Sequence, residues 1–144
     1  MLRVSRIINL SSFSQELQNE QDDLINWTAS LLNTVWKHQQ PGGYLLNYMD
    51  QLPNSTFIDA SGTALLAAAT FRLATIVAEI APALVNTQAA EKARSWVAAN
   101  IDSDGWLTNV VNPLNWHEAG SHSPEGQAFV LMLAAAYQDY LHRK

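Results

Sequence analysis

The chain has 144 residues, of which 48% are hydrophobic and 15% charged, a composition that fits one folded domain and excludes wholesale disorder. Its 8 basic and 13 acidic residues give a net charge of −5, so it lacks the strongly basic surface that is typical of nucleic-acid binding. Cysteine is absent, which excludes disulfides, thiolate nucleophiles and cysteine-based zinc sites.

The N-terminal stretch MLRVSRIINLSSFSQ carries two arginines and only a broken apolar run around Ile7 and Ile8. A secretory signal has about 7–15 apolar residues here, so we expect no signal peptide, and the cellular compartment stays unknown. We expect residues 1–13 to be flexible and residues 1–144 to form a single domain. The longest apolar run, TALLAAATF, is interrupted by Arg72 and Glu79 and is too short to span a bilayer, so no membrane contact is expected.

Apolar residues at helical spacing predict two helices in the first half of the chain. The first runs from about Ser14 to His38 and stops before Pro41 and two glycines, which cannot continue it. The second runs from Asp59 or Ala60 to about Ile80. Either Asp59 or Ser61 can cap its start.

Two more helices are predicted in the second half of the chain. The third, about Thr87 to Ala99, is amphipathic. The fourth, about Pro124 to His142, begins with Ser123 as its cap and with Glu125 at the positive end of the helix dipole. Because its body is apolar almost all round, we expect it to be buried. Strand signals are weak, and YLLNYM and GWLTNVV are the only candidates.

An internal repeat relates the two halves. GGYLLNYMD follows the first helix and DGWLTNVVN follows the third, and both read glycine, aromatic, leucine, any residue, asparagine from Gly43 and Gly105 onward. Farther along, DASGTALLAAA and SPEGQAFVLML each open an apolar helix, with Gly62 matching Gly126. Each unit is therefore an outer helix, a long turn and an inner helix. Two unrelated GG and DG turns, alike by chance, are the alternative.

The inner helices are apolar on more sides than two outer helices can cover, which is typical of helices buried in larger assemblies. We therefore expect the chain to form part of a larger toroid of αα-hairpins or to cover its open edges by self-association. A homo-oligomer that completes the toroid is one form of this expectation.

The repeat predicts that both long turns and both inner-helix starts lie at one end, which we call the rim. Aromatic rings cover the apolar faces of sugars, and carboxylates and amides bind hydroxyls, so this mixture suits a carbohydrate; paired carboxylates also serve glycoside chemistry. The rim collects these side chains: Tyr44, Asn47, Asp50, Asp59, Ser61, Trp106, Asn109, Trp116, His117, Glu118, His122, Glu125 and Gln127.

Each rim residue also has a purely structural interpretation. Asp59 can be a helix cap alone, Glu125 a helix-start charge, and Trp106 a packing anchor of its turn. His117 and His122 flank EAGS without the spacing of a metal motif such as HExxH, so no metal is expected. Phosphate loops of the forms GxGxxG and GxxxxGK[ST] are missing from both turns, and no cofactor is expected.

The strings DASGTALLAAATFRLA, DSDGWLTNVVNP and GSHSPEGQAFVLML resemble the C-terminal part of the fungal unsaturated rhamnogalacturonyl hydrolases, six-hairpin glycosidases of families 88 and 105. The resemblance covers roughly residues 15 to 143. It implies an all-α fold in which αα-hairpins form part of an (α/α)6 barrel, with about two of the six hairpins in this chain. Members of the family act on pectin and other uronides, either secreted or in the cytoplasm.

The resemblance also implies a reaction. Such enzymes remove a terminal 4,5-unsaturated uronic acid from an oligosaccharide: an Asp protonates the double bond, water adds at C5, and the hemiketal collapses to release the neighbouring sugar. The principal acid/base Asp of the family lies in a motif that precedes everything seen here, so its absence from this chain is expected. The resemblance leaves the catalytic residue unknown and assigns substrate contacts to Asp59, Ser61, Trp106, Trp116, His117, Glu125 and Gln127.

Three interpretations stay open. The chain is an incomplete glycoside hydrolase-like domain, a non-catalytic αα-hairpin module that binds carbohydrate or protein at the rim, or a helix-interface protein whose rim serves capping alone.

Overall fold

The structure, a computed structural model, describes residues 4, 7, 15–79 and 81–143. The predicted flexible segment 1–13, apart from residues 4 and 7, and the predicted helix ends at Ser14 and Ile80 lie outside the described residues. Within them the four predicted helices are confirmed, and the third has the predicted ends. The elements in chain order are α2 (Gln18–Trp36), α3 (Ala60–Val77), the short 3-10 helix η1 (Pro82–Leu84), α4 (Thr87–Ala99), β1 (Val110–Asn112), β2 (Asn115–Gly120) and α5 (Pro124–Leu141).

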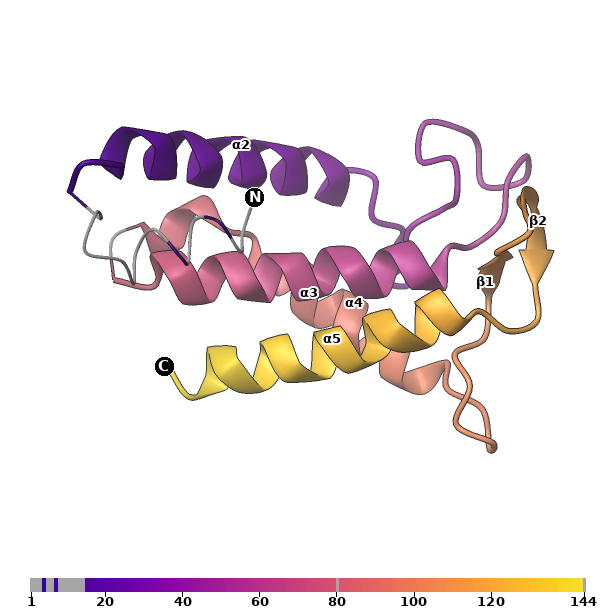
Figure 1. Ribbon diagram of the computed structural model, residues 1–144. Coiled ribbons are helices and arrows are strands. Elements are labelled where there is room, and N and C mark those ends of the chain that lie inside the picture. The colour runs from indigo at the N-terminus through magenta and orange to yellow at the C-terminus, as the bar shows by residue number, and fades with distance from the viewer. Residues whose placement is uncertain (1–3, 5–6, 8–14, 80, 144) are drawn as a thin grey trace.

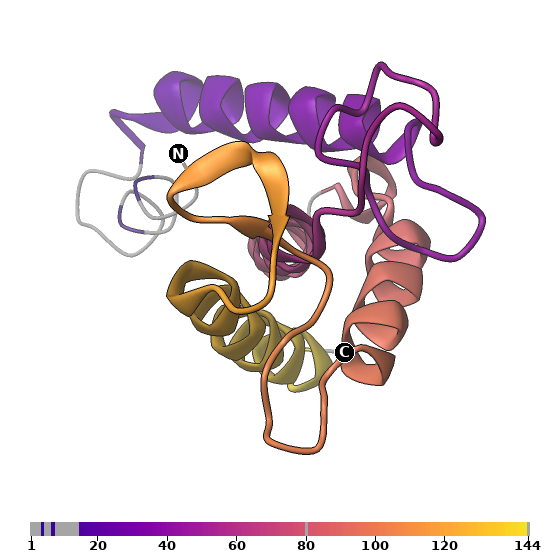
Figure 2. The same cartoon turned by 90° about the vertical axis from the view of Figure 1, so that its right-hand side faces the viewer.

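Helix α3 is the centre of the molecule. Viewed end-on it lies among α2, α4 and α5, and it contacts all three (Figure 2). Helices α3 and α5 run side by side in the same direction, so their first residues lie at the same end (Figure 1). The chain is thus two consecutive helix–turn–helix units whose inner helices are α3 and α5.

The sequence of α3 explains its central place. Among the described residues it is the one helix long and apolar enough to cross a membrane, and 61% of it is buried inside the protein. Its polar groups have partners within the core: Thr70 accepts a hydrogen bond of 3.0 Å from the indole N–H of Trp36 and donates one of 2.8 Å to the carbonyl of Leu66. Burial by the surrounding helices therefore accounts for its composition, and the statement that this apolar segment is too short to span a bilayer is wrong for the helix as a whole.

The prediction that the fourth helix is buried all round is wrong. Leu133 and Ala136 of α5 are buried, but Leu131 is 69% exposed and Met132 49% exposed. The reason is that α3 is the main neighbour of α5 in the described part of the chain, so one face of α5 is left open.

A β-hairpin was not predicted as such. Strands β1 and β2 pair antiparallel, with Val110 opposite Gly120 and Asn112 opposite Asn115, around a turn that contains Pro113. The weak candidate GWLTNVV ends in β1, whereas YLLNYM contributes only an isolated bridge between Leu46 and Ile58.

The two long turns adopt matching conformations at their glycines. Gly43 and Gly105 have φ angles of +106° and +87°, which favour glycine because it lacks a Cβ. The Gly43 N–H donates to the carbonyl of Gln40, and the Gly105 N–H donates to the carbonyl of Asp102, the residue in the same place of the second turn. This match supports a true repeat over two turns that are alike by chance.

The two glycines differ in what surrounds them, which gives a matched pair of variants. A Cβ on Gly43 would lie 2.7 Å from the carbonyl oxygen of Lys92, whereas a Cβ on Gly105 would meet nothing within 4 Å. We predict that Gly105→Ala lowers the free energy of unfolding by about 1–2 kcal/mol through backbone strain alone. Gly43→Ala adds a clash with the backbone of α4 and should lower it by roughly 3 kcal/mol. Urea unfolding of both variants checks this, and equal losses would contradict the predicted contact.

Candidate functional site

The two inner helices start side by side, as the repeat predicts. The backbone N–H of Ala60 at the start of α3 donates a 3.0 Å hydrogen bond to the carbonyl of Asn109 in the second long turn. Both long turns and the β-hairpin gather at this end of the molecule (Figure 2). The rim therefore exists, and each predicted residue can be placed on it.

Asp59 caps α3, and the alternative cap Ser61 is wrong. Its Oδ1 accepts a 2.8 Å hydrogen bond from the N–H of Gly62. Burial raises the pKa of the Asp59 carboxyl above its ordinary value of 3.8, while hydrogen bonds from the backbone of Gly62 and Ser61 act in the opposite direction. Asp59 is thus a partly buried carboxyl that holds its proton more tightly than a solvated one.

Ser61 lies where α3 meets α5. Its Oγ is buried and has no hydrogen-bond partner among the described residues. A Cβ built on Gly126 would lie 2.6 Å from this Oγ, so the glycine allows the two helix starts to approach. Ser61 is therefore a contact residue between the inner helices.

Glu125 and Gln127 are engaged by neighbouring groups of their own chain. Ser123 Oγ accepts from the N–H of Gly126 at 2.9 Å and donates to Glu125 Oε2 at 3.0 Å. The amide of Gln127 accepts from the N–H of Leu107 at 3.1 Å and donates to the carbonyl of Gly105 at 2.6 Å. A substrate contact by Gln127 would require exchange of these partners.

The β-hairpin is fixed to the first long turn by two hydrogen bonds. Asn47 Nδ2 donates to the carbonyl of Trp116 at 2.7 Å, and the hydroxyl of Tyr48 lies 2.6 Å from Nδ1 of His117. The Tyr48 and His117 rings also stack, with centroids 6.1 Å apart. The Trp116 side chain is 68% exposed although its backbone is held in place. An exposed indole on an anchored strand is suited to bind a ligand by stacking.

Trp106 lies on the second long turn and is 37% exposed. Its backbone N–H donates to Asp102 Oδ1 at 2.9 Å, and its ring meets the edge of His122 at a centroid distance of 4.9 Å. In the first turn, by contrast, Tyr44 packs on Trp96 at 5.1 Å, so it acts as a packing anchor.

Taken together, the rim offers aromatic faces, imidazoles and one partly buried carboxyl. Among residues 15–79 and 81–143, no three histidine, aspartate or glutamate side chains lie close enough to hold a metal ion. Sequence reasoning missed Tyr48 and the hairpin that it anchors. The Asn-Pro pair before Leu114 is a turn signal that could have revealed the hairpin, whereas nothing local marks Tyr48 as the partner of His117.

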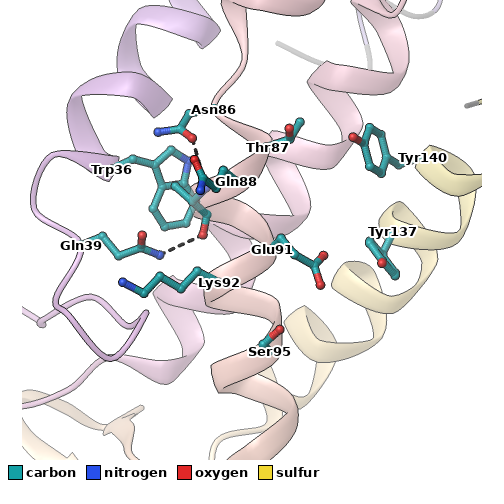
Figure 3. A pocket seen from close by; sticks show the side chains of 11 residues that line it. Trp36, Gln39, Asn86, Thr87, Gln88, Glu91, Lys92, Ser95, Tyr137 and Tyr140 are labelled. Carbon is teal, nitrogen blue, oxygen red and sulfur yellow. Dashed lines mark hydrogen bonds between the residues drawn. The ribbon is translucent and has the colours of Figure 1, made fainter.

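The largest hollow of the described structure lies elsewhere. It measures about 800 Å³, opens widely to solvent along α4, and has the α2 end with Trp36 on one side and Tyr137 and Tyr140 of α5 on the other (Figure 3). Gln39 Nε2 donates to the carbonyl of Ala89 within it. None of the predicted rim residues line this hollow, and its wide mouth gives a ligand little burial.

The raised pKa of Asp59 makes stability depend on pH. Since the folded chain binds this proton more tightly than the unfolded chain, the stabilisation is complete below about pH 3.8 and is lost as the pH rises through the folded pKa. Asn keeps the cap and stays neutral. We predict that Asp59→Asn is more stable than the wild type at pH 7 and that its advantage shrinks as the pH falls toward 4.

Urea unfolding between pH 4 and 7 measures this difference. Asp59→Ala removes the cap and should lose about 1 kcal/mol relative to Asp59→Asn at pH 7. Asp50→Asn, at an exposed acid of the same turn, serves as the control and should leave stability unchanged. An advantage of Asp59→Asn that is the same at every pH would contradict the assignment.

Comparisons with known proteins give the fold. No protein-family model matches the chain, and no curated protein matches it. A solved structure described as a possible member of the GH105 family, from Klebsiella pneumoniae subsp. pneumoniae, superposes with a TM-score of 0.66 and 22% identity over 81% of this chain and 32% of that one. A second, from Salmonella enterica subsp. enterica serovar Paratyphi A, gives 0.61 and 21% over 74% and 29%.

The chain spans less than a third of the length of each of these solved structures. At this identity the likeness shows the fold, which is all-α and resembles part of the GH105 (α/α) barrel. Both neighbours are bacterial, so the fungal relationship and the C-terminal position stay predictions.

Proposed function

We propose that this chain is glycoside hydrolase-like and that its rim binds an oligosaccharide ending in a 4,5-unsaturated uronic acid, from pectin or another uronide. The observation that carries the proposal is the pair of parallel inner-helix starts in a GH105-like fold, with Asp59 partly buried between two aromatic turns. The fungal, C-terminal relationship expected from the sequence belongs to the same proposal.

The proposed reaction is hydration of an enol ether. A proton adds at C4, water adds at C5, and the hemiketal opens to release the next sugar. A general acid for this step must hold its proton near neutral pH, and the pKa of Asp59 is shifted in that direction. Because the principal acid/base Asp is expected outside this chain, we assign Asp59 a substrate contact and regard the chain as an incomplete catalytic domain.

The other rim residues would bind the sugar. Trp116 and Trp106 offer indole faces for the apolar side of a pyranose ring. His117 is fixed through Nδ1 by Tyr48, which leaves Nε2 for the uronate carboxylate. Ser61, Glu125 and Gln127 would contribute at the helix starts.

A non-catalytic module that binds sugar at the same rim is the second candidate. The contacts of Glu125 and Gln127 favour it, because both side chains are engaged by the turn or the cap of their own repeat. Asp59 is also the one described carboxylate whose pKa burial clearly raises. Turnover separates the two candidates.

The test of turnover uses the full chain and an unsaturated uronyl disaccharide, with the absorbance of the conjugated double bond as the readout. Loss of absorbance that Asp59→Asn slows supports a hydrolase. Saturable binding of the disaccharide without loss of absorbance supports the binding module. Neither binding nor turnover contradicts the proposed function in both forms.

Binding gives a residue-level prediction. Trp116→Ala removes the exposed indole of the rim and should weaken disaccharide binding on the order of tenfold, or about 1.4 kcal/mol. Trp27→Ala is the matched control, because Trp27 is 61% exposed but lies on the outer helix α2. Calorimetric titration measures both variants. Equal effects, or a loss in Trp27→Ala alone, would contradict the assignment of the rim.

A further inference from the structure

Helix α5 carries an uncovered apolar stripe. Leu131 is 69% exposed and Met132 is 49% exposed, and two exposed alanines extend the stripe along the same helix face. A contiguous exposed apolar surface on a folded protein marks an interaction site. We call the following residues the α5 stripe: Ala128, Leu131, Met132 and Ala135.

The internal repeat shows what such a stripe does. With the offset of 64 residues that relates Gly62 to Gly126, the α5 stripe corresponds to residues of α3 that are 0–3% exposed: Ala64, Ala67, Ala68 and Phe71. This side of α3 faces α5, since Ser61 lies against Gly126 and Phe71 packs on Tyr137 at a centroid distance of 5.1 Å. The α5 stripe is thus the face by which one repeat packs on the next.

Helix α3 carries the complementary face. A second set of its residues is partly exposed, and we call it the α3 stripe: Gly62, Leu65, Ala69 and Ile76. The equivalent residues of α5 are buried or packed against the core: Gly126, Phe129, Leu133 and Tyr140. Each inner helix therefore uses one of two faces within the chain and leaves the other one open.

We propose that copies of this chain associate head to tail, with the α5 stripe of one copy on the α3 stripe of its partner. The contact would repeat the α3–α5 packing that already exists within the chain. A head-to-tail contact closes into a ring when its rotation fits, and otherwise continues as a filament. The chain spans 29% and 32% of its two structural neighbours, so three copies match the length of one barrel and form a closed ring.

The assembly has a consequence for the rim. The contact of Ser61 with Gly126 maps, one repeat further, onto Glu125 of one copy and the partner's Gly62. The partner's Asp59, which caps on that glycine, would then lie beside Glu125. Each rim site would gain a carboxyl group from a second copy. The assembly itself depends on helix packing and does not rest on the proposed activity.

Light scattering coupled to size exclusion tests the assembly with the full chain. The wild type should have three times the 15.9 kDa mass of the chain, and Leu131→Glu should reduce it to a single chain. Leu52→Glu is the matched control, because Leu52 is 71% exposed in the first long turn, and it should keep the mass of the wild type. A wild-type monomer or dimer, or an unchanged mass for Leu131→Glu, overturns the proposal.

Cross-linking tests the head-to-tail arrangement, and the absence of native cysteine makes it clean. The contact of Phe71 with Tyr140 maps onto Ala135 of one copy and the partner's Ile76. Chains carrying Ala135→Cys and chains carrying Ile76→Cys, once mixed, should join through a short bifunctional thiol reagent. Replacing Ile76→Cys by Leu52→Cys should abolish the product. Efficient joining of Ala135→Cys chains to each other would indicate a two-fold contact and overturn the arrangement.

Discussion

One hydrogen bond per repeat ties the long turn to the inner helix that follows it, and the geometry of the rim depends on it. The N–H of Leu45 donates to Thr63 Oγ1 at 2.9 Å, and the N–H of Leu107 donates to Gln127 Oε1 at 3.1 Å, with 64 residues between the two acceptors. Both leucines are 1% exposed. A buried N–H without a partner is destabilising by about 1–3 kcal/mol, so each turn must pass over the start of its own helix. Since α3 and α5 run in parallel, both turns reach the same end.

This arrangement uses polar groups that might otherwise meet a ligand, and it leaves others free. Gln127 holds its turn, and Ser123 engages Glu125, so the helix starts are largely occupied by structure. What faces outward is aromatic, above all Trp116 on a hairpin that Asn47 and Tyr48 anchor. The rim is therefore better equipped to hold a sugar than to carry out a reaction by itself. A carboxyl supplied by a second copy or by further hairpins would change that balance.

The helices and the repeat could be predicted from sequence because their signals are local: apolar periodicity, caps such as Asp59, and glycines at matching places. The all-α barrel-like fold was predicted through the resemblance. Three features depend on contacts across the chain and could not be read in this way. The exposed face of α5 follows from how many neighbours the helix has, the β-hairpin from pairing across an Asn-Pro turn, and the Tyr48–His117 contact from the approach of two turns 69 residues apart.

The central claim is that the two repeats form one ligand-binding rim at the starts of α3 and α5. Amide and indole chemical shifts, followed by NMR during titration with an unsaturated uronyl disaccharide, test it most directly. The account predicts changes that cluster on Asp59, Trp106, Trp116 and His117, with the hollow along α4 unaffected. Changes confined to Trp36, Tyr137 and Tyr140, which line that hollow, would contradict it.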